Sequence, residues 1–484
     1  MHIGLDLGTS GVKALMMTDD QRLVGTATGA LEVSRPHDGW SEQAPAAWIH
    51  ATEEALYALK ASHPIELAAV KGIGLSGQMH GATLLDGSDQ VLRPCILWND
   101  TRSWEEAAEL DADPAFRSIT GNIVFPGFTA PKLVWVSRKE PAIFDQTAKV
   151  LLPKDYLRLW LTGEHIGEMS DCAGTSWLDT AGRSWSSELL EKTGLSTKQM
   201  PALVEGTASS GKLRTELAQA FGMTTDVVVA GGAGDNAASA VGMGTITAGA
   251  AFVSLGTSGV LFAATDAYRP NADSAVHTFC HCLPDTWHQM GVILSATDTL
   301  NWFAGITGRA ADQLTDELGE QLEAPSGLTF LPYLSGERTP HNDASIRGAF
   351  LGLAHGTDRA LLTRAVLEGV AFAFADNLKA LAAAGTSLQR VTAIGGGSRS
   401  TYWLKLIATI LGIPVDVPVD GDFGAAFGAA RLGLIAATGA DPKTICTPPI
   451  IARTIEPEAA LKSAYDDAYA RFSALYPLLK DMKP

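Results

Sequence analysis

One five-residue string occurs twice in this chain, and the spacing of its copies constrains the fold more than any other feature. Residues 3–13 read IGLDLGTSGVK and residues 253–260 read VSLGTSGV. The shared LGTSG follows an apolar run in both places, and a separation of about 250 residues indicates a duplicated domain instead of a short-period repeat. A chain of 484 residues also exceeds what one hydrophobic core usually supports. The sequence therefore predicts two related domains.

Each copy of LGTSG is followed by a second apolar run, at 12–17 and at 260–264. This pattern predicts a hairpin turn, whereas the glycines of a Walker loop or a dinucleotide fingerprint lead into a helix. Backbone N–H groups and hydroxyls of such a turn can converge on a phosphate, while Asp6 can hold Mg²⁺ directly or through water. Lys13, across the hairpin, adds a positive charge. A plain Asp-Gly turn is the alternative, but two facing hairpins favour a clamp on a polyphosphate.

Charge and cysteine usage exclude several classes of protein. The 36 basic and 53 acidic residues give a net charge of −17, and no run of basic residues opposes it, which argues against a nucleic-acid or membrane partner. The N-terminus enters a strand-like run without a signal-like segment, and no window of about 18 apolar residues occurs. Five scattered cysteines are typical of reduced core thiols in a cytoplasmic protein. The triplet 280–282 (CHC) lacks a second ligand pair for a metal.

Three glycines at 395–397 follow an apolar run (391–394) and precede a predicted helix. Without side chains, this turn lets a flat or anionic ligand approach the backbone closely. A flexible turn between strand and helix is the alternative. Next to two phosphate-type hairpins, we favour an adenosine site that includes Ser398.

Asp235 lies in GGAGDNAAS, where a glycine turn becomes a helix. It can be an N-cap, a position that favours Asp, or a general base that takes the proton of an attacking hydroxyl. Both roles are compatible, because a helix N-terminus also favours the charge of a phosphoryl group. Residues 78–81 (QMHG) end another predicted strand and are typical of a sugar-hydroxyl site with an apolar wall, although a lone histidine is more often structural.

Strands alternate with amphipathic helices throughout, which predicts an α/β fold. Helices are expected at 361–383, at 423–437 with small residues on one face, and at 457–480. Residues 95–205 are too long for a simple connection. Their tryptophans are expected to add core, and some of them could line a sugar site.

Together these motifs resemble the FGGY family of carbohydrate kinases. The strings that carry the resemblance extend from residue 3 to about 430 and include IGLDLGTSGVK, GQMHGATLLD, LRPCILWNDTR, LLPKDYLRL, GGAGDNAA, SLGTSGV, PYLSGERTPHND and IGGGSRSTYW. QMHGATLLD and PYLSGERTPHN are specific to the branch that phosphorylates D-xylulose.

The resemblance implies an α/β fold of two actin-like (ribonuclease H-like) domains with a hinge and a cleft between them. The expected domains are 1–245, with the 95–205 excursion and the catalytic Asp, and 246–484, with the adenosine site and the terminal helix. The implied roles fall on Asp235 as catalytic base, Asp6 near the Mg²⁺, the sugar contacts Met79, His80, Asp235 and Asn236, and the ATP contacts Gly8, Thr9, Ser10, Lys13, Gly256, Thr257, Ser258, Gly395, Gly396, Gly397 and Ser398.

The expected reaction is ATP-dependent phosphorylation of D-xylulose at its 5-hydroxyl. The alternatives are another sugar kinase of the family, acting on ribulose, fuculose, glycerol or gluconate, or an actin-like ATPase without kinase activity. The expected partners are a sugar and ATP with Mg²⁺, and a homodimer is compatible with the sequence.

Overall fold

The computed structural model describes residues 1–419 and 423–482, which form two compact units, each discontinuous in sequence. Unit 1 contains residues 1–246, 279–287 and 423–449. Unit 2 contains residues 247–278, 288–419 and 450–482. The first stretch of unit 1 ends at residue 246, whereas we expected the division at 245/246, and two later segments also belong to that unit.

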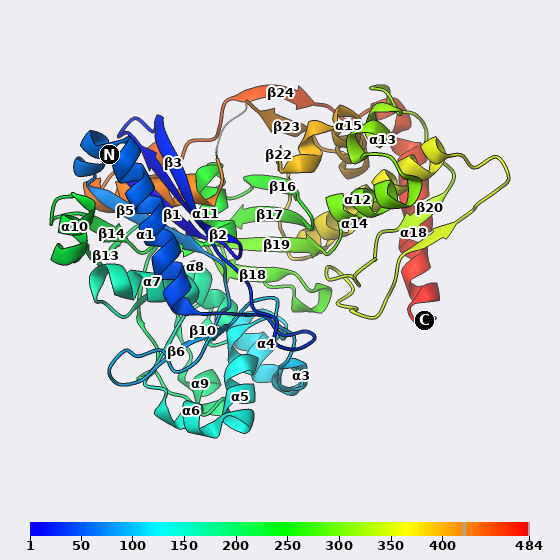
Figure 1. The fold of residues 1–484 in the computed structure, drawn as a ribbon. Coiled ribbons are helices and arrows are strands. Elements are labelled where there is room, and N and C mark those ends of the chain that lie inside the picture. The colour runs from blue at the N-terminus through cyan, green and yellow to red at the C-terminus, as the bar shows by residue number, and fades with distance from the viewer. Residues whose placement is uncertain (420–422, 483–484) are drawn as a thin grey trace. The chain divides into compact units, whose positions relative to one another are not determined.

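The central sheet of unit 1 has seven strands in the order β13–β14–β5–β1–β2–β3, with β15 paired to β5 (Figure 1). β1 runs parallel to β5 and antiparallel to β2, so LGTSG forms the predicted hairpin turn. The strands are β1 (His2–Leu7), β2 (Gly11–Met17), β3 (Leu23–Ala30), β5 (Gly72–Gly77), β13 (Ser209–Lys212), β14 (Val228–Ala230) and β15 (Ala233–Gly234). Helix α1 (Pro45–Ser62) packs against β2 and β3, and α11 (Asp235–Gly242) follows β15 directly.

Helix α16 (Ala425–Thr438), which we expected in the second domain, packs on β1, β5 and α11 of unit 1. Figure 1 shows its orange ribbon beside the blue strands. Glycines make this contact possible: a Cβ at Gly4 would lie 1.8 Å from the carbonyl oxygen of Ala426, and one at Gly74 would lie 1.8 Å from that of Ala429. The predicted small-residue face of α16 therefore brings its backbone onto the sheet.

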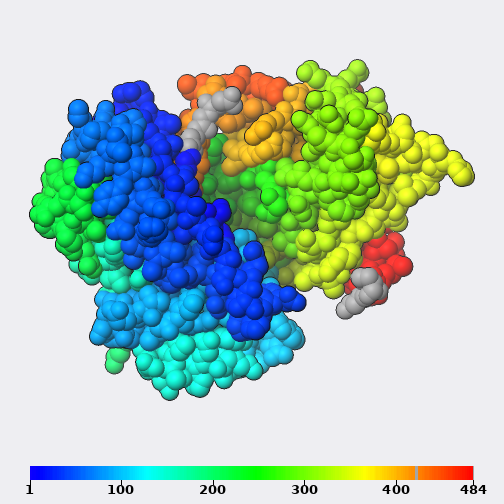
Figure 2. Space-filling view, viewed as in Figure 1, coloured from blue at the N-terminus to red at the C-terminus, as the bar shows by residue number. Residues whose placement is uncertain are grey.

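The excursion forms an additional layer of helices and short strands with its own core, in cyan to teal in Figure 2. Trp135 and Trp177 are buried in that core, and Trp160 packs against the core of the central sheet, as expected for extra core. Trp98 differs, because it is 48% exposed. The elements of the excursion are β7 (Cys95–Ile96), α3 (Trp104–Asp111), α4 (Pro114–Thr120), α5 (Thr129–Lys139), α6 (Pro141–Gln146), β8 (Lys149–Leu151), α7 (Pro153–Thr162), β9 (Ile166–Glu168), α8 (Met169–Cys172), β10 (Leu178–Asp179), β11 (Ser184–Trp185), α9 (Ser187–Lys192) and β12 (Ala202–Val204). Outside the excursion, β6 (Thr83–Leu85) pairs with β8, and α10 (Thr215–Phe221) packs into the core of the central sheet.

The sheet of unit 2 also has seven strands, in the order β18–β19–β17–β16–β22–β23–β24. Its strands are β16 (Ala251–Leu255), β17 (Gly259–Thr265), β18 (His277–Cys280), β19 (Trp287–Ile293), β22 (Val391–Ile394), β23 (Val415–Pro418) and β24 (Ile451–Ile455). β16 and β17 form the second predicted hairpin. Helices α12 (Thr297–Thr307), α14 (Arg359–Ala383), α15 (Thr401–Leu411) and α18 (Ala459–Leu479) share one core with this sheet, so the predicted helices at 361–383 and 457–480 are confirmed.

All five cysteines are buried and free of disulfides, as expected for core thiols. Among the described residues, no helix is both long and apolar enough to cross a membrane.

Candidate active site

Three parallel strands of unit 1 bring the predicted catalytic residues to one edge of the sheet. Asp6 of β1 is in register with Ser76 of β5, and Ser76 is in register with Ala233 of β15. Asp235 comes two residues after Ala233. Because the carboxyl ends of parallel strands meet at the same edge, Asp6, Asp235 and the segment after β5 gather there.

Asp235 is the first residue of α11, and the N-cap of that helix is Gly234. The predicted N-cap role of Asp235 is therefore wrong, because its backbone is already helical. Its Oδ1 accepts hydrogen bonds from the backbone N (2.7 Å) and from Nδ2 (2.9 Å) of Asn236. Burial and the negative charge of Asp6 raise the pKa of Asp235 to about 6, despite these two bonds. A carboxyl tuned this way fits a general base near neutral pH.

The turn at Gly8–Ser10 is held by side chains that sequence reasoning missed. The Thr9 hydroxyl donates to Oε1 of Gln78 (3.2 Å) and accepts from Nε1 of Trp98 (3.0 Å). Nε2 of Gln43 donates to the Thr9 carbonyl (2.7 Å) and Nε2 of Gln78 donates to Oε1 of Gln43 (3.0 Å). Lys13 lies directly opposite Asp6 in the hairpin, as predicted. This network fixes the backbone of the turn from which an anion would be bound.

Met79 and His80 follow the carboxyl end of β5, at the same sheet edge as Asp6 and Asp235. Met79 is buried, and its sulfur lies 3.0 Å from where a Cβ of Gly234 would be. His80 has a φ of 70°, a conformation uncommon outside glycine. Its ring stacks on Phe128, with ring centroids 4.5 Å apart, and its Nδ1 lies 2.7 Å from the carbonyl oxygen of Gly174. Since a carbonyl only accepts, Nδ1 donates in this contact and carries a proton.

A buried lysine holds the backbone at His80. Nζ of Lys132 donates to the carbonyl oxygens of His80 (2.8 Å) and Gly127 (2.7 Å). Burial lowers the pKa of Lys132 to about 7. No sequence pattern near Lys132 indicated this contact, since the two residues are 52 positions apart.

In unit 2 the second hairpin and the glycine turn lie side by side. Thr297, at the start of α12, donates from its N (2.9 Å) and its Oγ1 (2.7 Å) to the carbonyl oxygen of Gly256. A Cβ at Gly395, whose φ is 88°, would lie 2.7 Å from the carbonyl oxygen of Leu255. Ser398 donates to the Gly395 carbonyl (2.7 Å). The turn at Gly256–Ser258 and the segment Gly395–Ser398 are thereby joined.

A pocket of about 340 Å³ opens beside these glycines. Its lining consists of Thr297, Leu300, Asn301, Ala311, Asp312, Thr315, Asp316, Gly396, Gly397, Arg399, Ser400 and Trp403. The mixture of apolar side chains, polar groups and bare backbone suits a nucleoside. Gly396 and Gly397 were expected there, whereas the contributions of α12 and α13 (Ala311–Asp316) were not.

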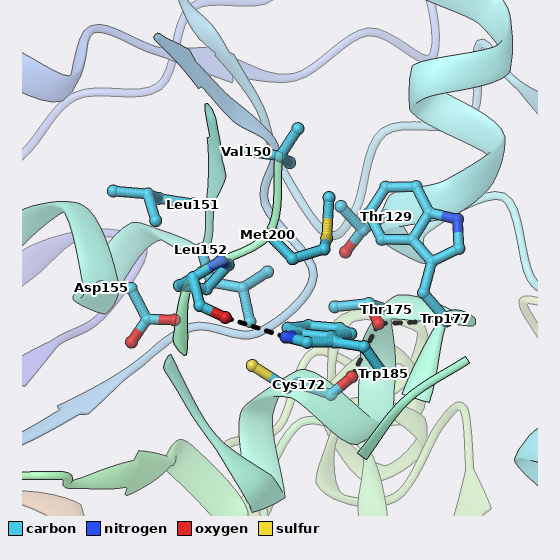
Figure 3. Close-up of a pocket in the computed structure, with 11 residues that line it drawn as sticks. Thr129, Val150, Leu151, Leu152, Asp155, Cys172, Thr175, Trp177, Trp185 and Met200 are labelled. Atoms are coloured by element: carbon cyan, nitrogen blue, oxygen red, sulfur yellow. Dashed lines mark hydrogen bonds between the residues drawn. The ribbon is translucent and has the colours of Figure 1, made fainter. Parts of the chain in front are cut away.

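The excursion contains a second cavity, lined by Thr129, Asp155, Cys172, Trp177 and other residues (Figure 3). Its volume of about 10 Å³ holds one water molecule at most and excludes a sugar. This cavity therefore does not provide the sugar site that we considered for the excursion.

The residues near Asp6 do not form a complete protein cage for a metal. In residues 1–419 and 423–482, no group of three or more His, Cys, Asp or Glu could hold an ion. Mg²⁺ is commonly bound by one or two carboxylates together with substrate phosphates, so Asp6 beside the Gly8–Ser10 turn fits a nucleotide-bound Mg²⁺.

A hairpin turn after a β-strand in each of two α/β units, with two carboxylates at the sheet edge of unit 1, is the arrangement of the actin-like ATPase fold. The chain belongs to the FGGY family of carbohydrate kinases: the N-terminal domain of that family matches residues 1–242 and the C-terminal domain matches residues 251–437.

Individual proteins agree with this assignment over their full lengths. The chain is 50% identical to the xylulose kinase of Escherichia coli over 485 aligned residues, covering 98% of each chain. A crystal structure described as a xyloylose kinase from Brucella ovis is 69% identical, with a TM-score of 0.99 and complete coverage of both chains. The xylulose kinase structure from Rhodospirillum rubrum is 31% identical, with a TM-score of 0.93 and 99% coverage of both.

Proposed function

We propose that this protein transfers the γ-phosphoryl group of ATP to the 5-hydroxyl of D-xylulose, giving D-xylulose 5-phosphate and ADP. The observation that carries the proposal is the placement of Asp235, with its pKa of about 6, at the strand edge that also holds Asp6 and His80. The xylulose kinases among its relatives support the choice of sugar. Since ATP is the donor, the proposed place of action is the cytoplasm.

The proposed sugar contacts come from Met79, His80 and Asn236. Nε2 of His80 accepts from a sugar hydroxyl, the thioether of Met79 forms an apolar wall, and Asn236 orients Asp235 through its two hydrogen bonds. Asp235 removes the proton of the 5-hydroxyl while that oxygen forms a bond to the γ-phosphorus. The bond between the γ-phosphorus and the bridging oxygen breaks, and its electron pair leaves with ADP.

The proposed ATP contacts are backbone N–H groups of the Gly8–Ser10 and Gly256–Ser258 turns for the phosphates, with Lys13 adding a positive charge. The 340 Å³ pocket beside Gly395–Ser398 takes the adenosine. Mg²⁺, held by Asp6 directly or through water, would neutralise charge on the phosphates when bound. Such fixed donors act where charge develops in the transition state.

The test is ADP release with a panel of acceptors: D-xylulose, L-ribulose, L-fuculose, glycerol, gluconate and no sugar. The highest kcat/KM is expected for D-xylulose, and ³¹P NMR should identify the 5-phosphate as the product. A higher kcat/KM with another acceptor would overturn the choice of sugar. Equal ADP release with and without sugar would instead point to an actin-like ATPase.

A further inference from the structure

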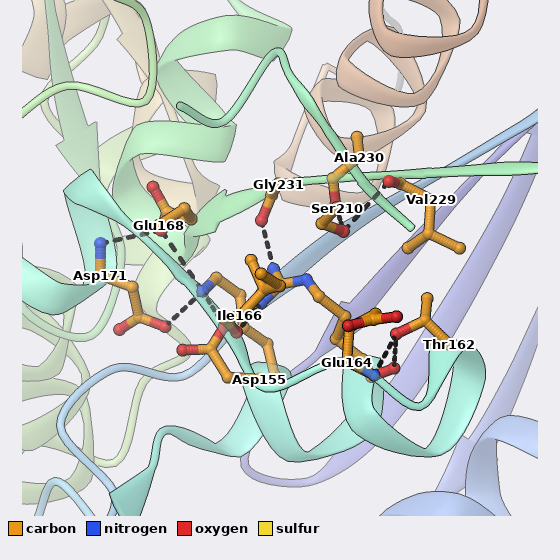
Figure 4. Close-up of polar contacts among 12 residues, drawn as sticks. Asp155, Thr162, Glu164, Ile166, Glu168, Asp171, Ser210, Val229, Ala230 and Gly231 are labelled. Atoms are coloured by element: carbon orange, nitrogen blue, oxygen red, sulfur yellow. Dashed lines mark hydrogen bonds and ion pairs between the residues drawn. The ribbon is translucent and has the colours of Figure 1, made fainter. Parts of the chain in front are cut away.

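Five charged side chains of unit 1 form a completely buried cluster that the proposed mechanism does not use (Figure 4). Nζ of Lys154 lies 2.7 Å from Asp155, 3.0 Å from Asp171 and 3.3 Å from Glu168. Arg158 pairs with Asp155 at 2.5 Å and donates to the Ile166 carbonyl at 2.6 Å. We name these residues the charge cluster: Lys154, Asp155, Arg158, Glu168 and Asp171.

Burying so many charges is costly, and a buried ion cluster usually contributes little net stability compared with apolar residues. Two cations face three carboxyl groups. Burial, together with the charges of Asp155 and Glu168, raises the pKa of Asp171 to about 8 despite Lys154. A cluster of this kind is better explained by what it positions than by its contribution to stability.

The charge cluster contacts one end of the glycine turn at 231–234 directly and the other end through Ser170. Nη2 of Arg158 donates to the carbonyl oxygen of Gly231. At the other end, the backbone N of Gly234 donates to Oγ of Ser170 (3.1 Å). The Ser170 hydroxyl is itself set by the carboxylate of Glu168, 2.9 Å away, which also accepts from the backbone N of Ser170 at 2.7 Å.

Residue 234 is the N-cap of α11, and the next residue is Asp235. The turn between the two contacts is tight, since Gly232 has a φ of 79° and a Cβ there would lie 2.3 Å from the Leu75 carbonyl oxygen. Movement of either end is thus transmitted to the first residue of the helix.

We propose that Ser170 and Arg158 are positioning residues that hold the glycine turn and thereby orient the carboxylate of Asp235 toward the attacking hydroxyl. The inference rests on the proposed role of Asp235 as general base. In-line transfer depends on reacting atoms held within about 3–3.5 Å of each other, and small misplacements have large effects on rate. The contacts of Arg158 with Gly231 and of Ser170 with Gly234 fix the backbone of the turn that precedes Asp235.

The main variant is Ser170→Ala, which removes the acceptor for the Gly234 N–H. Its matched control is Ser210→Ala: Ser210 is also buried and donates to the carbonyls of Val229 and Ala230 (3.0 Å each), just before the turn. Arg158→Lys is the second variant, because it keeps the positive charge beside Asp155 but loses the Nη2 donor to the Gly231 carbonyl. Melting temperature, kcat and both KM values are measured for each protein.

We expect Ser170→Ala and Arg158→Lys to lower kcat roughly tenfold or more with both KM values within about twofold. Ser210→Ala should keep kcat within about twofold at a similar loss of melting temperature. The acid limb of the pH–rate profile should also move below pH 6 in Ser170→Ala, because a loosened Asp235 is better solvated. In an Asp235→Asn background, Ser170→Ala should cost no further activity, since residues that act as a unit are not additive.

Equal kcat in Ser170→Ala and Ser210→Ala, or a full additional loss in the Asp235→Asn background, would overturn the positioning role alone. Near-normal turnover of Asp235→Asn itself would overturn the proposed base, and with it this inference. If Ser170→Ala does not fold, Arg158→Lys decides: unchanged kcat and an unchanged pH profile in that variant reject the proposal.

Discussion

Asp6 and Asp235 lie at the ends of two strands that flank β5, and the charge of the first raises the pKa of the second. Burial is the larger cause of the raised pKa of Asp235, and the charge of Asp6 acts in the same direction. The proposed Mg²⁺ ligand Asp6 is therefore electrostatically coupled to the proposed general base Asp235.

This relationship predicts the pH dependence of activity. Asp235 must be ionised to accept a proton, so kcat/KM should fall below a pH of about 6, its pKa in the free protein. Asp6→Asn removes the negative charge and should move that limb to lower pH. The measurement is kcat/KM from pH 5 to 8 at saturating ATP. An acid limb that stays in place in Asp6→Asn would contradict the electrostatic coupling.

Replacement of the base should cost activity. Asp235→Asn is expected to lower kcat by roughly 10²-fold or more, because the hydroxyl proton loses its acceptor. Asn keeps the acceptor oxygen that bonds to Asn236, so the fold should persist. ATP binding, measured by calorimetry, serves as the control. Near-normal kcat would leave Asp235 without a catalytic role.

The same substitution should stabilise the protein at neutral pH. The pKa of Asp235 in the folded protein, about 6, exceeds the ordinary Asp value of 3.8. The folded state therefore binds the proton more tightly, and the contribution of Asp235 to the free energy of unfolding falls as pH rises from 3.8 through 6. At pH 7.5 the raised pKa lowers the stability of the folded state by less than about 3 kcal/mol, because solvent reaches the half-buried side chain and screens its charge. Asp235→Asn should therefore melt at a higher temperature than wild type at pH 7.5, with the gain vanishing near pH 4. A constant difference across this range would contradict the raised pKa.

His80 should act on the sugar and not on the nucleotide. His80→Asn removes the ring but suits the positive φ at this position better than Ala does. The KM for the sugar should rise roughly tenfold, equivalent to about 1.4 kcal/mol, with the KM for ATP unchanged. His165→Asn is the control, since His165 lies in the excursion and pairs with Asp89. Parallel increases in both KM values would rule out a sugar-specific role.

The proposed adenosine site can be tested at Gly396, where a larger side chain would not collide with the protein. A Cβ at Gly396 would meet no protein atom within 4 Å, yet this residue lines the 340 Å³ pocket. Gly396→Val should therefore keep the melting temperature but raise the KM for ATP roughly tenfold by occupying the ligand's space. Gly305→Ala, in α12 and equally unobstructed, is the matched control. An unchanged KM for ATP in Gly396→Val would place the adenosine elsewhere.

Local patterns were sufficient for those parts of the fold and site that depend on neighbouring residues. The two hairpins followed from glycines between apolar runs. The long helix predicted at 361–383 is present as α14, but its residues 363–375 are buried on all faces, so the expected amphipathic pattern is wrong. Contacts between distant residues could not be predicted from the sequence, because only the tertiary fold brings the partners together. Examples are Lys132 with His80, Ser170 with Gly234, and Trp98 with Thr9. The N-cap error at Asp235 has a different cause, since helix boundaries shift by one residue without changing the sequence pattern.

The late position of α16 in the chain has a consequence for biosynthesis. A Cβ on Gly428 would lie 1.8 Å from the Ala238 carbonyl oxygen, so this helix is seated on backbone made nearly 200 residues earlier. While the ribosome is still adding residues 247–424, the face of β1 and β5 that α16 later covers is exposed, and the nascent chain holds an unfinished unit. Unit 1 becomes complete only after most of unit 2 has been synthesised. It therefore cannot complete its fold first, as folding domain by domain from the N-terminus would require.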